Sequence, residues 1–141
     1  MWRSELSYLI DTNVISEIRK GRKANAAVLD WFEENQDEGY FLSTLVVGEI
    51  RKGIERLGPV NAKGARRLDA WLAETCRLFD GRIIPVDIDV AEEWGRMSAS
   101  DPPPVIDGLL AATAVTRGLT LATRNTADIE RTGVSWVNPF G

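Results

Sequence analysis

The sequence predicts an α/β domain in which helices cover both faces of a mostly parallel sheet of four to five strands. Short apolar runs alternate along the chain with longer segments whose apolar residues recur every three or four positions. This alternation is typical of parallel strands joined by right-handed helical connections. The 141 residues, 44% of them hydrophobic, are enough to bury a core, and we expect a single domain over residues 1–141.

The first half of the chain contains two predicted strands and four predicted helices. The strands cover residues 8–10 and 39–43, and the helices cover residues 14–20, 24–35, 44–57 and 61–79. Gly21 ends the first helix, and Gly58 with Pro59 ends the third. Apolar residues at positions 46, 50, 54 and 57 form one stripe of the third helix, which we expect to face the core.

The second half continues the alternation with three strands and three helices. The strands cover residues 82–86, 119–123 and 134–137, and the helices cover residues 89–98, 105–117 and 126–131. Pro85 has no backbone N–H, so we expect the end of the third strand to be unpaired in mid-sheet. Residues 100–104, with three consecutive prolines, form a stiff connector rather than a domain boundary.

The residue types that are missing narrow the chemistry. The chain has no histidine, which excludes imidazole acid–base catalysis, Ser-His-Asp triads and histidine metal sites. The only cysteine, Cys76, excludes disulfides and multi-cysteine zinc sites within the chain, and we expect it to lie in a helix as a core residue. A net charge of −4 indicates no broad basic surface. Carboxylates are therefore the best candidates for any catalysis.

The same features bear on location. Only five uncharged residues, 6–10, precede Asp11, which is too short a run for a signal peptide or a membrane span. Because disulfides are absent as well, we expect a cytoplasmic protein that does not bind a membrane.

Asp11 directly follows the first predicted strand, in the stretch Tyr8-Leu9-Ile10-Asp11-Thr12-Asn13. In open α/β sheets, ligands bind at the carboxyl ends of the strands, so Asp11 is a candidate site residue. The alternative is that Asp11, Thr12 or Asn13 only caps the next helix.

Other acidic residues are predicted to reach the same edge of the sheet. Glu49 interrupts an apolar run in the helix after the second strand, where burying an unpaired carboxylate is costly. Asp107 lies in the first turns of the helix at 105–117 and joins the site only if that helix starts at the same cleft. Asn125 and Asp128 follow the fourth strand. The alternatives are an exposed Glu49 and an Asp107 that only complements the helix dipole.

Carboxylates gathered at one cleft repel each other unless a cation lies between them. Oxygen ligands favour Mg²⁺ or Mn²⁺, and zinc is a poor candidate for this chain. Such an ion, held by two or three carboxylates, can activate water and bind a phosphodiester.

Four groups of residues then follow one another in a recognisable order. They are Leu9-Ile10-Asp11-Thr12-Asn13-Val14; Ser43 with Glu49-Ile50; the run from Asp107 to Ala114; and the run from Leu121 to Ile129, with Asn138-Pro139 after it. Together they resemble PIN-domain ribonucleases of the VapC type, the toxins of bacterial toxin–antitoxin pairs. The resemblance covers nearly the whole chain and implies a three-layer α/β/α fold and RNA cleavage that depends on Mg²⁺ or Mn²⁺.

The resemblance also implies roles for individual residues. By position, Asp11 and Asp107 are the principal metal ligands and Glu49 is the third carboxylate, while Asn13 and Thr123 are polar supports of the site. The partners that it implies are RNA, a second copy of the chain in a homodimer, and a small antitoxin that binds operator DNA.

The sequence departs from the family at Asn125, where many relatives have a fourth acid. The nearest acid is Asp128, which we expect to act directly or through water, with Asn125 as a further support of the site. The alternative is a site that holds only one tight metal ion. The triple proline also looks stiffer than the usual approach to the third acid. The candidate RNA contacts are four basic residues near the site: Arg124, Arg51, Lys52 and Arg56.

Two other functions compete with the ribonuclease. A phosphatase of the haloacid dehalogenase type also places an Asp after its first strand, but it needs a second Asp two residues on, where this chain has Asn13. A catalytically weak PIN-like binding domain is favoured only by Asn125.

Overall fold

The computed structural model describes residues 6–141, so the first five residues of the predicted domain lie outside it. The strands are β1 (Tyr8–Ile10), β2 (Tyr40–Ser43), β3 (Ile83–Ile84), β4 (Thr120–Ala122) and β5 (Trp136–Val137). The helices are α1 (Thr12–Ile18), α2 (Ala26–Glu34), α3 (Thr44–Leu57), α4 (Ala62–Leu78), α5 (Ile88–Ser98), α6 (Val105–Arg117) and α7 (Thr126–Ile129). Three 3₁₀ turns are η1 (Gly21–Lys23), η2 (Gln36–Glu38) and η3 (Glu130–Thr132).

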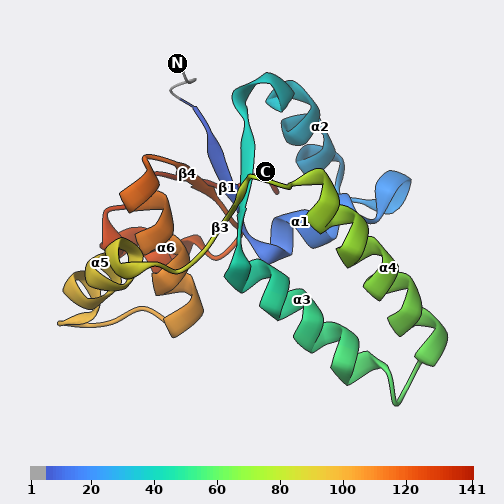
Figure 1. Cartoon of the computed structure of the whole chain (residues 1–141). Helices are drawn as coiled ribbons and strands as arrows, with labels where there is room; N and C mark the ends of the chain where they lie inside the picture. Colours follow the sequence, from blue (N-terminus) through green and yellow to red (C-terminus); the bar gives the residue numbers. More distant parts are fainter. Residues whose placement is uncertain (1–5) are drawn as a thin grey trace.

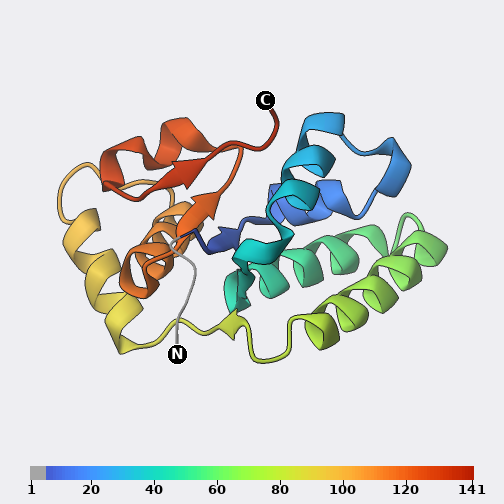
Figure 2. The same cartoon turned by 90° about the horizontal axis from the view of Figure 1, so that it is seen from above.

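The five strands form one parallel sheet in the order β3-β2-β1-β4-β5. Central β1 pairs Tyr8 with Tyr40 of β2 and with Thr120 of β4. The chain moves outward from β1 to β3 and then crosses back to β4. Because the connections are right-handed, this reversal puts the helices before β3 and the helices after β3 on opposite faces. Figures 1 and 2 show α1 to α4 on one side of the sheet and α5 and α6 on the other. The predicted three-layer α/β/α fold is confirmed.

The core lies between these layers. The strand residues Leu9, Ile10, Leu42 and Leu121 are almost completely buried, as expected for a sheet that is covered on both faces. On α3, the predicted stripe is confirmed, since Val46, Ile50 and Ile54 are buried. Among the residues that the structure describes, no helix is long and apolar enough to cross a membrane.

Several predicted boundaries shift because side chains cap the helices. The first helix begins at Thr12 rather than at residue 14, since Asp11 accepts a hydrogen bond from the Thr12 N–H. The second begins at Ala26, since Asn25 accepts bonds from the N–H groups of Ala27 and Val28. The third strand is only two residues long, and Pro85 lies beyond its paired part, as predicted.

Candidate active site

Asp11 is both a helix cap and the most buried carboxylate of the site. Its side chain is only 4% exposed, at the carboxyl end of central β1. One oxygen, Oδ1, accepts a 2.6 Å hydrogen bond from the backbone N–H of Thr12, which begins α1. The two interpretations of Asp11 that the sequence left open are therefore compatible, because the cap places the carboxylate at the ligand-binding edge of the sheet.

The second oxygen of Asp11 is held by the polar residues that were expected to support the site. Thr123, buried at the end of β4, donates its hydroxyl to Asp11 Oδ2 at 2.6 Å, and the Asn13 amide donates to the same oxygen at 3.4 Å. The Asn125 N–H donates in turn to Thr123 Oγ1 at 3.0 Å. These donors hold the Asp11 carboxylate in one orientation.

Glu49 reaches the same edge from α3. Ser43, the last residue of β2, caps this helix by accepting the Leu45 N–H at 3.0 Å, and Glu49 lies in the second turn, half-buried. Its Oε1 accepts a 2.6 Å hydrogen bond from the Thr12 hydroxyl. Thr12 thus links the carboxylate after β1 to the carboxylate after β2. From its sequence position, Thr12 is expected only as a possible helix cap, although its place next to Asp11 is a usable signal for this second contact.

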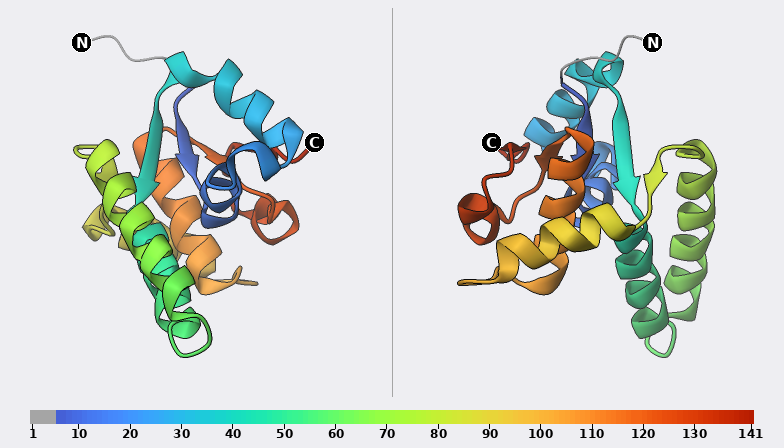
Figure 3. Two further views of the ribbon diagram at one scale, coloured as in Figure 1. Left: turned by 90° about the vertical axis from the view of Figure 1, so that its right-hand side faces the viewer. Right: turned by 60° about the vertical axis from the view of Figure 1, so that its left-hand side comes forward.

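Asp107 approaches from the opposite layer. It lies in the first turn of α6, and Figure 3 shows that this helix starts at the end of the sheet where β2 leads into α3. Burial, followed by the charge of Asp11, raises the pKa of Asp107 from 3.8 to about 6. The charges of Asp128 and Glu49 raise the same pKa, and a hydrogen bond from the Asn125 side chain lowers it. Because α6 starts at the same edge of the sheet as Asp11 and Glu49, Asp107 is included in the site.

Opposing effects act on Asp11 itself. Burial raises the pKa of the Asp11 carboxyl, and the charge of Glu49 adds to this, whereas the hydrogen bonds from Thr123, Thr12 and Asn13 lower it. Negative charges thus lie close together at a partly buried edge of the sheet. A cation placed between them would relieve this repulsion.

The donor set suits a hard divalent cation because it consists of carboxylate, hydroxyl and amide oxygens. Mg²⁺ usually binds one or two carboxylates and keeps several waters. Among the neighbouring charges, that of Asp11 raises the pKa of Asp107 the most, so these two carboxylates lie close together. Within residues 6–141, no three acidic or cysteine side chains stand close enough together to form a ready-made ion site. The residues therefore fit an ion with two direct protein ligands and water, and Glu49 remains a predicted third carboxylate.

The four predicted RNA contacts differ in their surroundings. The Arg124 guanidinium lies 3.7 Å from the centre of the Phe140 ring, and the Arg124 backbone N–H donates to Asn13 Oδ1 at 3.2 Å. Arg124 therefore borders the acidic cluster, which consists of Asp11, Glu49 and Asp107. By contrast, Arg51 forms a 2.8 Å ion pair with Asp69 of α4. Lys52 and Glu49 line a cavity of about 290 Å³ between α3 and α6. Arg56 is exposed in the last turn of α3.

Comparison with known proteins agrees with this geometry. A family model of the PIN domain matches residues 8–134. The VapC ribonuclease Y4jK of Sinorhizobium fredii is 33% identical over 137 residues, which cover 94% of this chain and 96% of that protein. The toxin FitB of Neisseria gonorrhoeae is 34% identical over 138 residues, with coverage of 94% and 97%. A solved structure of FitAB bound to an IR36 DNA fragment matches with a TM-score of 0.83 and 32% identity, covering 95% of this chain and 96% of that one.

Proposed function

This chain belongs to the PIN-domain family, and from that premise we propose that it is the toxin of a bacterial toxin–antitoxin pair, an endoribonuclease that depends on Mg²⁺ or Mn²⁺. The observation that carries the proposal is that Asp107, from the layer opposite α1, lies close enough to Asp11 for the Asp11 charge to raise its pKa. The family does not support the phosphatase alternative, and the amide of Asn13 donates to Asp11 where that chemistry needs a second carboxylate.

Each residue has a role that follows from its contacts. Asp11 and Asp107 would hold the cation, which supplies a Lewis acid that polarises the phosphodiester and makes water more acidic. Thr123, Asn13 and the Thr12 N–H fix the orientation of Asp11. Glu49, kept in place by the Thr12 hydroxyl, can accept a proton or orient a water beside the reacting phosphate.

Cleavage by water sets the products. The water oxygen forms a bond to phosphorus, and the bond between phosphorus and O3′ breaks. The proton released by water goes to a carboxylate or to solvent, and the departing O3′ takes up a proton from solvent. The fragments then carry a 5′-phosphate and a 3′-hydroxyl. Because the chain has no histidine, it lacks the imidazole groups that would assist attack by the RNA 2′-hydroxyl. We assign the nearest phosphate contact to Arg124, with Lys52, Arg56 and Arg51 as outer contacts.

We also propose that the chain forms a homodimer and that an antitoxin silences it by covering the cleft. The similarity to FitB, which is called a toxin, and to a solved structure in which FitAB is bound to DNA supports the antitoxin partner. The cavity between α3 and α6, lined by Leu45 and Ile106 beside Glu49, could take an apolar side chain of the antitoxin. With a net charge of −4, this chain contacts operator DNA only through that partner.

The experiment that tests the ribonuclease is cleavage of unstructured RNA followed by analysis of the ends. We expect cleavage with Mg²⁺ or Mn²⁺ that stops in EDTA, and fragments that can be ligated directly through their 5′-phosphates. Cyclic phosphate ends, or full activity in EDTA, would contradict the proposal.

The amide at Asn125 favours a second candidate, a PIN-like domain that binds RNA without cutting it. Asn125 donates a hydrogen bond to Asp107, at a position where a fourth acid would strengthen cation binding. This candidate predicts weak Mn²⁺ binding in a calorimetric titration and intact RNA after prolonged incubation.

A further inference from the structure

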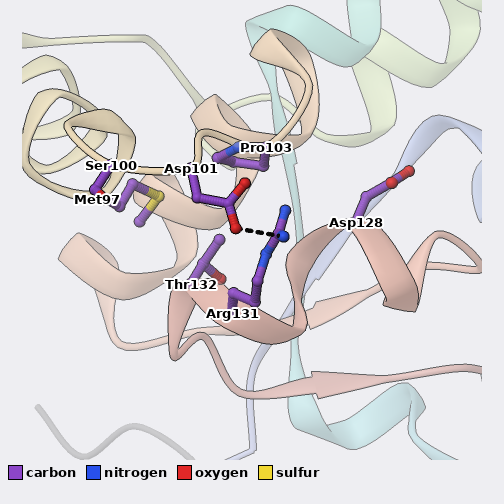
Figure 4. Close-up of a pocket in the computed structure, with 7 residues that line it drawn as sticks. All are labelled: Met97, Ser100, Asp101, Pro103, Asp128, Arg131 and Thr132. Atoms are coloured by element: carbon purple, nitrogen blue, oxygen red, sulfur yellow. Dashed lines mark hydrogen bonds and ion pairs between the residues drawn. The ribbon is translucent and has the colours of Figure 1, made fainter.

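A second cavity, of about 240 Å³, lies beside the acidic cluster and has no role in the chemistry above. Its walls come from the end of α5, the proline-rich connector, α7 and η3. The lining residues are Met97, Ser100, Asp101, Pro103, Asp128, Arg131 and Thr132. Figure 4 shows the Asp101 and Arg131 side chains pointing toward one another in this cavity.

The Asp101–Arg131 pair combines hydrogen-bond acceptors and donors. Arg131 Nη1 donates to Asp101 Oδ2 at 2.6 Å, and the two side chains are 59% and 70% exposed. The pair therefore leaves one carboxylate oxygen and further guanidinium N–H groups open to a ligand. Met97 and Pro103 add apolar surface beside these polar groups.

The connector holds Asp101 in an unusual backbone conformation. Asp101 has φ 52°, and no other non-glycine residue in the described part of the chain has a positive φ. Such a conformation costs free energy and persists where the surroundings enforce it, often at a ligand site. The three prolines that follow restrict the connector further. The Asp101 carboxylate is thus presented to the cavity by a stiff segment.

Asp128 lies between this cavity and the edge of the sheet where Asp11 is held. It lines the cavity, and in Figure 4 its carboxylate points away from the Asp101–Arg131 pair. The Asp128 N–H donates to the Asn125 carbonyl at 3.3 Å, and the Asn125 N–H donates to Thr123, which holds Asp11. The cavity therefore lies about one helical turn from the residues that orient Asp11.

We propose that this cavity binds a guanine base of single-stranded RNA, in the nucleotide next to the phosphate that is cut. The proposal rests on the ribonuclease function. Because Arg131 is already paired with Asp101, the pair has no net positive charge, which disfavours a phosphate in the cavity and favours an uncharged ligand with N–H donors. Unpaired RNA bases are commonly read through hydrogen bonds to their exposed edges.

Guanine fits the pair better than the other bases do. It presents two adjacent acceptors, O6 and N7, beside two adjacent donors, N1–H and the N2 amino group. Arginine recognises O6 and N7 as a fork, and a carboxylate can accept from the two donors. Adenine, cytosine and uracil each lack either the paired donors or the paired acceptors. Arg131 and Asp101 are therefore assigned as specificity-determining residues.

The test measures cleavage of single-stranded oligoribonucleotides that contain one guanine in an otherwise uniform sequence. The guanine is moved along the strand, or replaced by inosine, which lacks the N2 amino group, or by 7-deazaguanine, which lacks N7. We expect the position of the cut to move with the guanine. For the two analogues we expect kcat/KM to fall roughly 5- to 150-fold, the range of one good base contact.

Protein variants supply the second arm. Asp101→Asn keeps the side-chain shape and tolerates the positive φ, so it should fold. We expect Asp101→Asn and Arg131→Gln to lose the preference for guanine while still cutting guanine-free RNA at the parental rate. The matched control is Arg96→Gln, which breaks an exposed ion pair on α5 with Glu93 at 3.2 Å outside this cavity.

The outcomes separate the two proposals. If the parent cuts all oligonucleotides equally, or if both variants keep the preference for guanine, the base pocket is wrong and the ribonuclease stands. A preference for another base that both variants lose would contradict the assignment to guanine. If the parent cuts no RNA in any metal, both proposals are wrong.

Discussion

At the scale of single residues, Asp11 shows why a cap and a catalytic residue are hard to distinguish in a sequence. Asp, Asn, Ser and Thr are all good helix caps, so an Asp after a strand is expected on structural grounds alone. Its proposed catalytic role depends on Thr123, which donates to it from 112 residues away. No local pattern encodes that contact, whereas the position at the end of a strand was sufficient to nominate Asp11.

Asp107 allows a prediction about stability in the absence of metal. Its pKa in the folded protein, about 6, exceeds the ordinary 3.8, so its negative charge opposes folding. The stability contribution of the neutral carboxyl is fully present below pH 3.8 and is lost as the pH rises through 6. Asp107→Asn should therefore stabilise the metal-free protein at pH 7.5 by about 1 kcal/mol, a few degrees in Tm, after allowance for solvent screening of a half-exposed group.

The measurement is a pair of thermal melts in EDTA at several pH values. The gain from Asp107→Asn should shrink steadily between pH 7 and pH 4. Asp30→Asn, at an exposed position on α2, is the control and should show no such trend. A variant that melts below the parent at pH 7.5 would show that Asp107 stabilises the fold instead of straining it.

At the scale of elements, the alternation of strands and helices was sufficient to predict every strand in order, because apolar periodicity is a strong local signal. The predicted ends of the helices were less accurate. η1 at Gly21–Lys23 separates α1 from α2, and the last predicted helix divides into α7 and η3. Gly21, with φ 61°, and Asn25 as the cap account for the late start of α2. Such ends depend on a few hydrogen bonds rather than on periodicity.

The exposed apolar residues of two helices bear on the proposed homodimer. Of the eight large apolar side chains that are exposed in the described residues, four lie on α5, on α6 or just before α5: Val86, Ile88, Val105 and Val115. Light scattering should give a mass near twice the 15.6 kDa of one chain. Ile88→Glu should shift this mass toward the monomer, because a charge would replace an apolar contact at the interface.

The matched control for the dimer is Val60→Glu. Val60 is 86% exposed, between α3 and α4 and away from α5 and α6. It should leave the mass unchanged. A parental chain that is monomeric at high concentration, or an Ile88→Glu variant that stays dimeric, would count against an interface built on these helices.

In the whole molecule, the topology of the chain brings the site residues to one edge of the sheet. The chain crosses from β3 back to β4 through α5 and α6, so α6 starts at the edge where β1 and β2 end. The sequence could nominate Asp11, Glu49 and Asp107 separately, because each lies at a strand end or near a helix start. It could not show that Thr12 bonds to Glu49, or that Asp101 meets Arg131, since both contacts depend on side-chain positions across distant segments.

If the carboxylates at this edge form a catalytic centre, Asp11→Asn should remove RNA cleavage without unfolding the protein. Asn caps a helix about as well as Asp and removes a buried charge, so the metal-free variant should melt at the parental temperature or above. Its cleavage rate in Mn²⁺ should fall by at least about 100-fold, the scale of losing one essential electrostatic group. Mn²⁺ should raise the Tm of the parent and leave that of the variant nearly unchanged. Near-parental cleavage by a folded Asp11→Asn variant would contradict the account and leave Asp11 as a helix cap alone.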